Sequence, residues 1–257
     1  MAITRLLAAT DGSDHGDHAA DVARTLAAEA GADLSVLGVE TGGLPVVAFS
    51  RTTVRRVTTV GTMLWAKGVP GVEIVRRAEL SGSDLLVLGR RSRSPEAPLP
   101  LGPTSDAVIR RRHRPTLLIP WNVSTIRRVV IALDGTRRGL AVLAPAAEFI
   151  SATGAEASVV CAIADSGVLE GDSLWSDPRT SRITEALRRF PVFGRAGILR
   201  IRRGSPVPEI LEVIEETSAD TLVLGVRRGG PAGEMGSGHV GRDLLQSAPG
   251  AILTVPI

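Results

Sequence analysis

A glycine-dense loop near the end of the chain has the residue types of an anion-binding site. Six glycines lie between Gly225 and Gly238 with both ends counted, and Arg227 and Arg228 lie among them. An apolar, β-branched run precedes the loop, and a short helix is expected at Val240–Ser247. Glycines let backbone N–H groups approach an anion, and a helix N-terminus favours negative charge. The loop therefore predicts a phosphate-binding site, with a plain connector as the alternative.

The same unit occurs earlier in the chain. Asp84 to Gly89 matches Asp220 to Gly225, 136 positions later. The turn Asp11-Gly12-Ser13 matches Asp134-Gly135-Thr136, 123 positions later, so the first copy is shorter between its second and third strands. Two copies of more than about a hundred residues predict two homologous domains rather than a solenoid. We expect repeat one at 1–122 and repeat two at 126–257.

Each repeat has the pattern of strands that alternate with helices. This order predicts an α/β protein with two tandem, doubly wound, five-stranded parallel sheets of Rossmann-like type. The strands are expected at 3–9, 34–39, 62–67, 84–88 and 115–120, and again at 129–133, 158–162, 198–202, 219–225 and 251–255. The helices are expected at 14–31, 71–81 and 104–113, then at 136–152 with a kink at Pro145, 178–190, 208–218 and 240–247. Segment 41–60 has no clear pattern.

The third strand of repeat one has two possible positions. If Val72–Arg77 were the strand, only residues 78–83 would remain to cross to the next parallel strand. A parallel crossover needs about a dozen residues. The third strand is therefore predicted at Thr62–Lys67, with a helix after it.

The two closing strands, Pro115–Pro120 and Gly250–Ile257, are predicted to meet. Each would otherwise be an exposed apolar sheet edge, which invites aggregation. We expect the two repeats to pack about a pseudo-two-fold axis through these strands, as an intramolecular pseudo-dimer. A homodimer of the whole chain remains an open alternative.

Composition excludes several classes of protein. The formal net charge is +3, with 30 basic and 27 acidic residues, too balanced for a dedicated nucleic-acid surface. No apolar run approaches the length of a membrane helix, and Cys161 is the single cysteine. These features favour a cytoplasmic protein without disulfides. The glycine loops lack lysine, so no Walker A motif is present, and no Gly-x-Ser-x-Gly motif occurs.

At these residues the chain resembles the universal stress protein family, as a tandem of two domains. In that family an acidic residue follows strand one, a hydrophobic residue ends strand two, and a Gly-x2-Gly-x9-Gly-Ser/Thr motif follows strand four. Nucleotide-binding members hold ATP there. The matching residues are Asp11 and Asp134 at the acidic position, Val39 and Ala162 at the strand-two position, and Gly89, Gly102, Gly225 and Gly238 at the first and third glycines.

This chain departs from the family pattern at four places. The second glycine is Ser92 in repeat one and Arg228 in repeat two, where Gly229 follows, and the final Ser/Thr is Pro103 and His239. Pro103 has no N–H to offer a phosphate. His239 keeps its backbone N–H as a donor for a phosphate and adds an imidazole side chain. The next residue, Val240, begins the expected helix. Repeat two is therefore the better candidate site, whereas repeat one, with Thr104 as the expected helix cap, is the weaker one.

The resemblance implies a stress-response regulator or sensor that binds an adenine nucleotide, ATP with or without Mg²⁺. The alternatives are a nucleotide-free scaffold that acts through protein–protein contacts, and a slow ATPase. No catalytic residue is predicted. The run of Asp and His between Asp11 and Asp21 is interpreted as charge favoured at a helix N-terminus rather than as a metal site.

Overall fold

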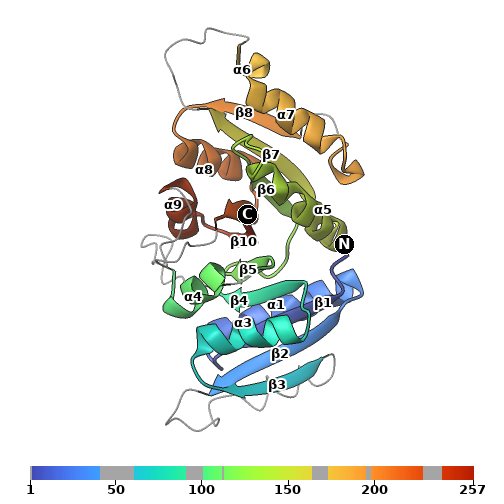
Figure 1. Ribbon diagram of the computed structural model, residues 1–257, viewed down its shortest axis with the longest axis vertical. Coiled ribbons are helices and arrows are strands. Elements are labelled where there is room, and N and C mark those ends of the chain that lie inside the picture. The colour runs from blue at the N-terminus through green and yellow to red at the C-terminus, as the bar shows by residue number, and fades with distance from the viewer. Residues whose placement is uncertain are drawn as a thin grey trace.

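The computed structural model describes residues 2–40, 61–90, 101–111, 113–163, 173–194, 198–227 and 239–257. Their strands form one ten-stranded sheet in the order β3-β2-β1-β4-β5-β10-β9-β6-β7-β8. Repeat one contributes β1 (Arg5–Thr10), β2 (Asp33–Glu40), β3 (Thr62–Lys67), β4 (Leu85–Gly89) and β5 (Thr116–Ile119). Repeat two contributes β6 (Arg128–Ala132), β7 (Glu156–Ile163), β8 (Leu199–Arg203), β9 (Thr221–Val226) and β10 (Ala251–Pro256). The predicted fold class is confirmed (Figure 1).

Strands are parallel within each half of the sheet, and the two halves join through β5 and β10, which are antiparallel. Leu117 faces Leu253, its own counterpart 136 positions later, while Leu118 faces Ile252 and Thr116 faces Thr254. A residue that pairs with its own repeat equivalent lies on a two-fold axis. The predicted meeting of the closing strands about a pseudo-two-fold axis is therefore confirmed.

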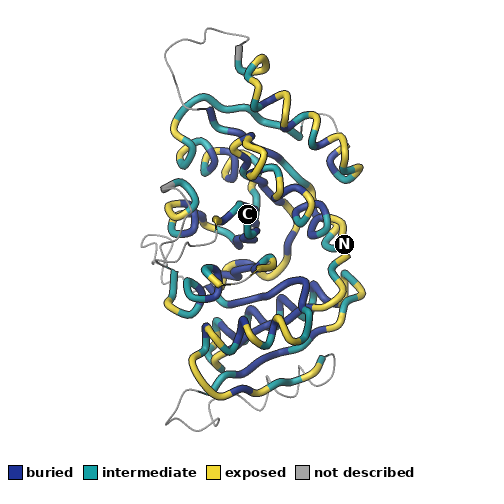
Figure 2. The backbone as a smooth tube through the Cα atoms, viewed as in Figure 1, coloured by how far each residue is buried: buried dark blue, intermediate teal, exposed yellow. Residues whose placement is uncertain are grey.

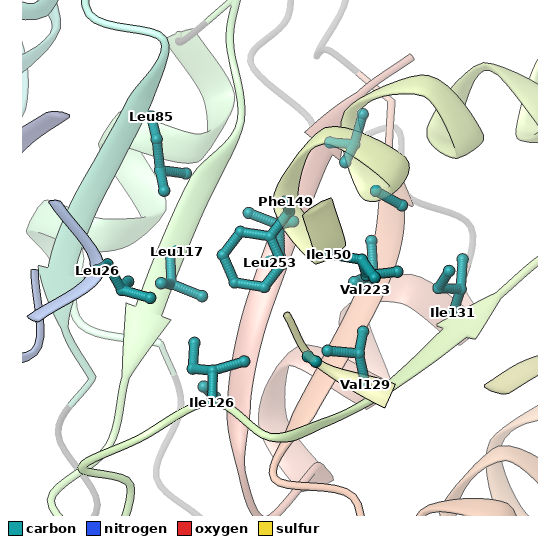
Figure 3. Packing of buried hydrophobic residues seen from close by; sticks show 14 of the residues in the cluster. Leu26, Leu85, Leu117, Ile126, Val129, Ile131, Phe149, Ile150, Val223 and Leu253 are labelled. Atoms are coloured by element: carbon teal, nitrogen blue, oxygen red, sulfur yellow. The ribbon is translucent and has the colours of Figure 1, made fainter. Parts of the chain in front are cut away.

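Helices cover both faces of the sheet. One face carries α1 (Asp14–Ala30), α5 (Leu143–Thr153) and α7 (Pro178–Leu187), whose buried side chains share one core cluster. The other carries α3 (Pro70–Leu80), α4 (Pro103–Arg111), α8 (Pro206–Thr217) and α9 (His239–Ser247). Each cluster contains residues of both repeats, so each hydrophobic core continues across the seam. Buried backbone is dark blue in both halves of Figure 2, and Figure 3 shows side chains of the first cluster, with Leu117 of repeat one near Leu253 of repeat two. Among the described helices, none has the length and apolar character needed to cross a bilayer.

The predicted third strand is confirmed, because β3 spans Thr62–Lys67 and Val72–Arg77 lies inside α3. The helices predicted from 71, 104, 208 and 240 start one or two residues earlier than expected, and the start predicted at Thr136 was wrong. The helix expected from Thr136 is a 3-10 turn, η2 (Gly139–Val142), followed by α5 from Leu143. Pro145 lies in the first turn of α5, where an N–H has no helical partner, so it sits at a helix start rather than at a kink.

Thr104 does not cap α4, because the helix already begins at Pro103. Proline is favoured at the first helical position, since its fixed φ suits the helix and its missing N–H would have no helical partner there. The carbonyl of Gly102 accepts the first helical hydrogen bond, from Asp106 N at 2.9 Å. Pro103 is therefore explained by the helix start alone.

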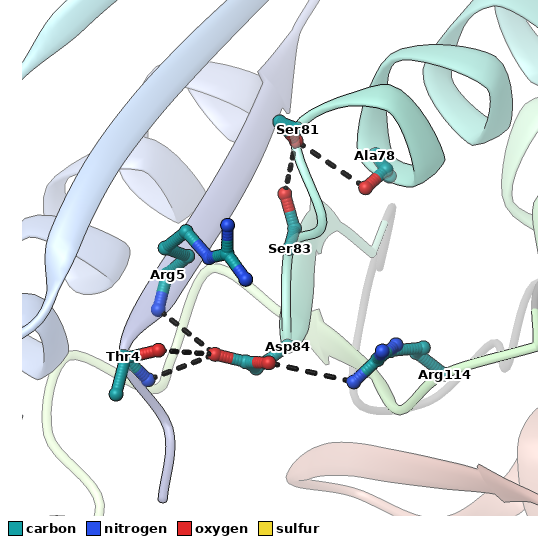
Figure 4. Close-up of polar contacts among 7 residues, drawn as sticks. All are labelled: Thr4, Arg5, Ala78, Ser81, Ser83, Asp84 and Arg114. Carbon is teal, nitrogen blue, oxygen red and sulfur yellow. Dashed lines mark hydrogen bonds and ion pairs between the residues drawn. The ribbon is translucent and has the colours of Figure 1, made fainter.

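In each repeat an aspartate just before the fourth strand accepts hydrogen bonds from the start of the first strand, which is β4 to β1 in repeat one and β9 to β6 in repeat two. Asp84 Oδ2 accepts from Thr4 N at 2.9 Å, Thr4 Oγ1 at 2.8 Å and Arg5 N at 3.1 Å, and Arg114 lies 3.4 Å from Oδ1 (Figure 4). Burial raises the pKa of Asp84, but the hydrogen bonds from Thr4 and Arg5 and the charge of Arg114 outweigh it, so the net pKa is lowered. In repeat two the equivalent Asp220 accepts from two backbone N–H groups, those of residues 127 and 128. The repeat is thus preserved in polar contacts as well as in strands.

Candidate functional site

The turn after β6 fixes the acidic residue of repeat two. Asp134 Oδ1 accepts from Thr136 N at 2.9 Å and from Thr136 Oγ1 at 2.8 Å. Gly135 adopts φ +66°, the left-handed region that glycine tolerates. A Cβ on Gly139 would lie 2.0 Å from Asp134 Oδ1, so only glycine lets η2 pass this close. The turn therefore presents the Asp134 carboxylate at the carboxyl end of β6.

A cavity of about 250 Å³ lies beside this turn, at the carboxyl ends of β6, β7 and β9. Ala132, Ala162 and Leu224 form its floor on the face covered by α8 and α9. The two alanines are small, which leaves space between the sheet and the helices. The walls are mostly apolar, with Val142, Ile210, Leu244 and Ile257 among them. Parallel α/β sheets bind ligands at this end of their strands.

Four of the residues predicted for repeat two come together in this cavity. Asp134, Ala162, Gly225 and Val240 all line it, and so does Arg227. Of the other predicted residues, Arg228, Gly229 and Gly238 lie outside the described residues. His239 is the first residue of α9, so its backbone is at the N-terminus of that helix, next to Val240.

Sequence reasoning missed several contributors to the cavity. Pro206 and Ile210 belong to α8, whose N-terminus also meets the cavity. Gly139 follows Thr136 by three positions, as Gly16 follows Ser13. A Cβ on Gly16 would lie 2.6 Å from Thr10 Oγ1 and 2.9 Å from Asp11 Oδ1. The repeated spacing Asp-Gly-Ser/Thr-x-x-Gly was therefore a readable signal for a helix that packs on the acidic turn.

Helix α7 supports the Asp134 turn from the opposite face of the sheet. Arg182 Nη1 donates to Gly135 O at 2.9 Å, and a Cβ on Gly135 would lie 2.5 Å from Arg179 Cβ. Arg179 makes a salt bridge of 2.8 Å with Asp177, which raises the pKa of the guanidinium and lowers that of the carboxyl. Neighbouring Cys161 is buried, and burial raises its pKa to about 11. These contacts fix the position of the turn without entering the cavity.

Repeat one has the same turn but a tighter approach of its helix. Asp11 Oδ1 accepts from Ser13 N at 3.1 Å and from the Ser13 hydroxyl. A Cβ on Gly89 would lie 2.9 Å from the backbone O of His15, in the first turn of α1. In repeat two the equivalent Gly225 meets the side chains of Val142 and Ile257 instead. The main chain of α1 therefore lies against the end of β4, whereas side chains lie against the equivalent end of β9.

The remaining predicted residues of repeat one are spread over separate elements. Val39 is on β2, where repeat two has the smaller Ala162. Gly102 precedes α4, and a Cβ there would meet nothing within 4 Å. Thr104 is inside α4. Within the described ranges, no group of three or more His, Cys, Asp or Glu side chains is placed to hold a metal ion.

Two doubly wound half-sheets, with a cavity at the strand ends of one, define a tandem α/β protein of Rossmann-like architecture. The model of the universal stress protein family matches residues 56–120 and 125–256. The chain therefore belongs to the universal stress protein family.

Solved structures match this chain over nearly its whole length or over about half of it. A universal stress protein from Archaeoglobus fulgidus DSM 4304 is 19% identical, with a TM-score of 0.74 over 100% of this chain and 99% of that chain. A functionally unknown protein from Pseudomonas aeruginosa PAO1 is 17% identical, with a TM-score of 0.73 over 99% of this chain and 93% of that chain. A universal stress protein in complex with cAMP is 26% identical and covers 47% of this chain and 98% of that chain, with a TM-score of 0.39. A search of curated proteins finds no match.

Proposed function

We propose that this chain binds an adenine nucleotide, ATP, in repeat two and acts as a stress-response regulator or sensor. The observation that carries the proposal is the cavity that contains Asp134, Ala162, Gly225 and Val240 together. Asp134, Ala162 and Gly225 are described residues of repeat two that match the nucleotide-binding pattern of the family, and Val240 lies in the first turn of α9. Domains at 1–122 and 126–257, with the working site in the second, are part of the same proposal.

The walls of the cavity suit a purine base. Ile210, Leu224 and Leu244 are buried apolar side chains that line it. A base that enters replaces water against these side chains, which is favourable in proportion to the apolar area covered. Binding pockets for small molecules combine such walls with a few polar groups that fix orientation. Asp134 is the one carboxylate among the described lining residues, and it is suited to accept hydrogen bonds from a ribose hydroxyl or the adenine amine.

The phosphates would lie at the α9 end of the cavity. The N-terminal residues of α9 expose backbone N–H groups without helical partners, and the helix dipole favours an anion there. Arg227 lines the same cavity and is exposed, so its guanidinium is available for a charge-assisted contact. The glycine loop from Gly229 to Gly238, with Arg228 before it, would complete the phosphate site. Mg²⁺ would bind through the phosphates of ATP and, at most, one carboxylate of the chain.

A thermal-shift screen tests the proposal. The intact chain is heated with ATP, ADP, AMP or cAMP, and without nucleotide. A ligand at about 100 times its Kd stabilises the folded state by about 2.7 kcal/mol. For domains of this size that corresponds to an increase in Tm of about 5–10 °C. If no nucleotide changes the Tm, the chain is a nucleotide-free scaffold.

Hydrolysis is a separate question within the same site. Slow release of phosphate from ATP, abolished by Asp134→Asn, would assign the chain as a slow ATPase. We expect binding without turnover, because Asp134, the one carboxylate among the described lining residues, is assigned to the adenosine and not to the phosphates at the α9 end.

A further inference from the structure

Arg90 follows β4 of repeat one, and its side chain crosses into repeat two. Nη1 donates to the carbonyl of Ala248 at 2.6 Å and to that of Gly250 at 2.9 Å. Nη2 donates to the carbonyl of Leu245 at 2.9 Å and, at 3.4 Å, to that of Gln246. The side chain is 8% exposed. Burial lowers its pKa to about 10, which still leaves it charged at neutral pH.

Two of the four carbonyls, those of Leu245 and Gln246, belong to the last turn of α9, and those of Ala248 and Gly250 belong to the segment between α9 and β10. The last carbonyls of a helix have no helical partner, and the end of the helix dipole there favours a cation. No basic residue lies in the last turn of α9. Arg90 therefore supplies, from the other repeat, both the donors and the positive charge that α9 lacks.

The equivalent helix of repeat one, α4, has basic residues of its own at its C-terminal end. The last turn of α4 contains Arg110 and Arg111, and Arg111 Nη1 donates to Ala107 O at 3.1 Å. The residue of repeat two that corresponds to Arg90 is Val226, 136 positions later, which has no donor to offer. The contact is therefore one-sided: repeat one holds a helix of repeat two, and repeat two makes no matching contact through Val226.

We propose that Arg90 is a positioning residue for the ligand cavity of repeat two. This inference rests on the proposed function. Leu244 lines the cavity, and the carbonyl of the next residue, Leu245, is bound by Arg90. Val240 and Gly241 line the same cavity one turn nearer the N-terminus. Because a helix of this length moves as a rigid element, fixing its C-terminal end fixes the direction in which its N-terminal N–H groups point.

Repeat one then contributes to the site without touching the ligand. In repeat one the main chain of α1 approaches the end of β4 closely, at Gly89, and the next residue, Arg90, is buried against repeat two. Repeat two therefore needs Arg90 of repeat one for its full affinity for the nucleotide, and this need is met because both repeats belong to one chain.

The test compares Arg90→Met and Arg90→Lys with the unchanged full-length chain. Hydrogen exchange of the α9 amides and ATP affinity by calorimetry are measured at a temperature where all chains are folded. Arg90→Met should raise α9 exchange and weaken ATP binding by about tenfold, or about 1.4 kcal/mol. For Arg90→Lys, both α9 exchange and ATP affinity should lie between those of the unchanged chain and those of Arg90→Met. An ammonium keeps the positive charge but cannot reach all four carbonyls.

Thr254→Val is the matched control. Thr254 Oγ1 donates to Thr116 O at 3.0 Å across the same seam, so this variant removes a buried hydrogen bond between the repeats that does not involve Arg90. Because it keeps every hydrogen bond of Arg90, it should leave α9 exchange and ATP affinity unchanged. Unchanged α9 exchange or ATP affinity in Arg90→Met overturns the inference, as does an equal loss of affinity in Thr254→Val. If the unchanged chain binds no nucleotide, the proposed function fails, while faster α9 exchange in Arg90→Met still supports Arg90 as the residue that positions α9.

Discussion

Replacing Gly135 with alanine tests how tightly the Asp134 turn is built. Gly135 has φ +66°, and alanine in this left-handed region costs about 1–2 kcal/mol. The new Cβ would lie 2.5 Å from Arg179 Cβ and 3.0 Å from Arg179 Cα, so α7 would have to shift. Overpacking of this kind typically costs about 1–3 kcal/mol more. The free energy of unfolding should therefore fall by about 2–5 kcal/mol.

Gly154→Ala is the matched control for that prediction. Gly154 has φ +64°, but a Cβ there would meet nothing within 4 Å. Both substitutions carry the same backbone strain and the same reduction of unfolded-chain entropy. The difference between them, about 1–3 kcal/mol, measures the contact with α7 alone. Urea unfolding followed by circular dichroism gives both values, and equal losses would refute the packing of α7 on the turn.

Three further predictions follow from buried groups. Asp84→Asn should destabilise the chain at pH 7, because the charged carboxylate accepts hydrogen bonds from Thr4. Since the folded pKa of Asp84 is lowered, its contribution is present above about pH 4 and is lost as pH falls through that pKa, so urea unfolding at pH 3 should show a smaller gap between wild type and variant. Cys161, with a pKa of about 11, should resist an aromatic disulfide reagent at pH 7 until urea is added, and rapid labelling of the native chain would contradict its burial. Phe149→Ala should cost about 3–5 kcal/mol by urea unfolding, because the ring is 1% exposed in the core that both repeats share, and a loss below about 1 kcal/mol would contradict that packing.

Most strands of the sheet were predictable because they are buried on both faces. Such strands are continuous apolar runs, and the internal repeat gave each run a partner 136 or 123 positions away. The minimum length of a parallel crossover then decided between Thr62–Lys67 and Val72–Arg77. The need to cover two apolar edges predicted that β5 and β10 meet, and the structure adds the register, with Leu117 opposite Leu253.

The candidate site was predictable only in part. Asp134 and Gly225 could be placed because they follow strands directly, and parallel strand ends meet at one edge of a sheet. Helix starts were harder, because Pro145 and Pro103 fit either an interrupted helix or a helix start. Arg90 could not be assigned from sequence, since its partners are carbonyls of a helix about 155 positions away and any residue type could supply them.

Calorimetric titration of ATP into the wild-type chain, Asp134→Ala and Asp11→Ala tests the central claim most directly. Each substitution removes the same kind of turn, in which Oδ1 accepts from the N–H and hydroxyl of Thr136 or Ser13, so the local structural cost is shared. Only Asp134 also lines the described cavity. The wild-type chain should bind about one ATP, Asp134→Ala should bind it at least about tenfold more weakly, a loss of about 1.4 kcal/mol, and Asp11→Ala should bind it as the wild type does. Equal losses in the two variants, or no binding by the wild-type chain, would contradict the account.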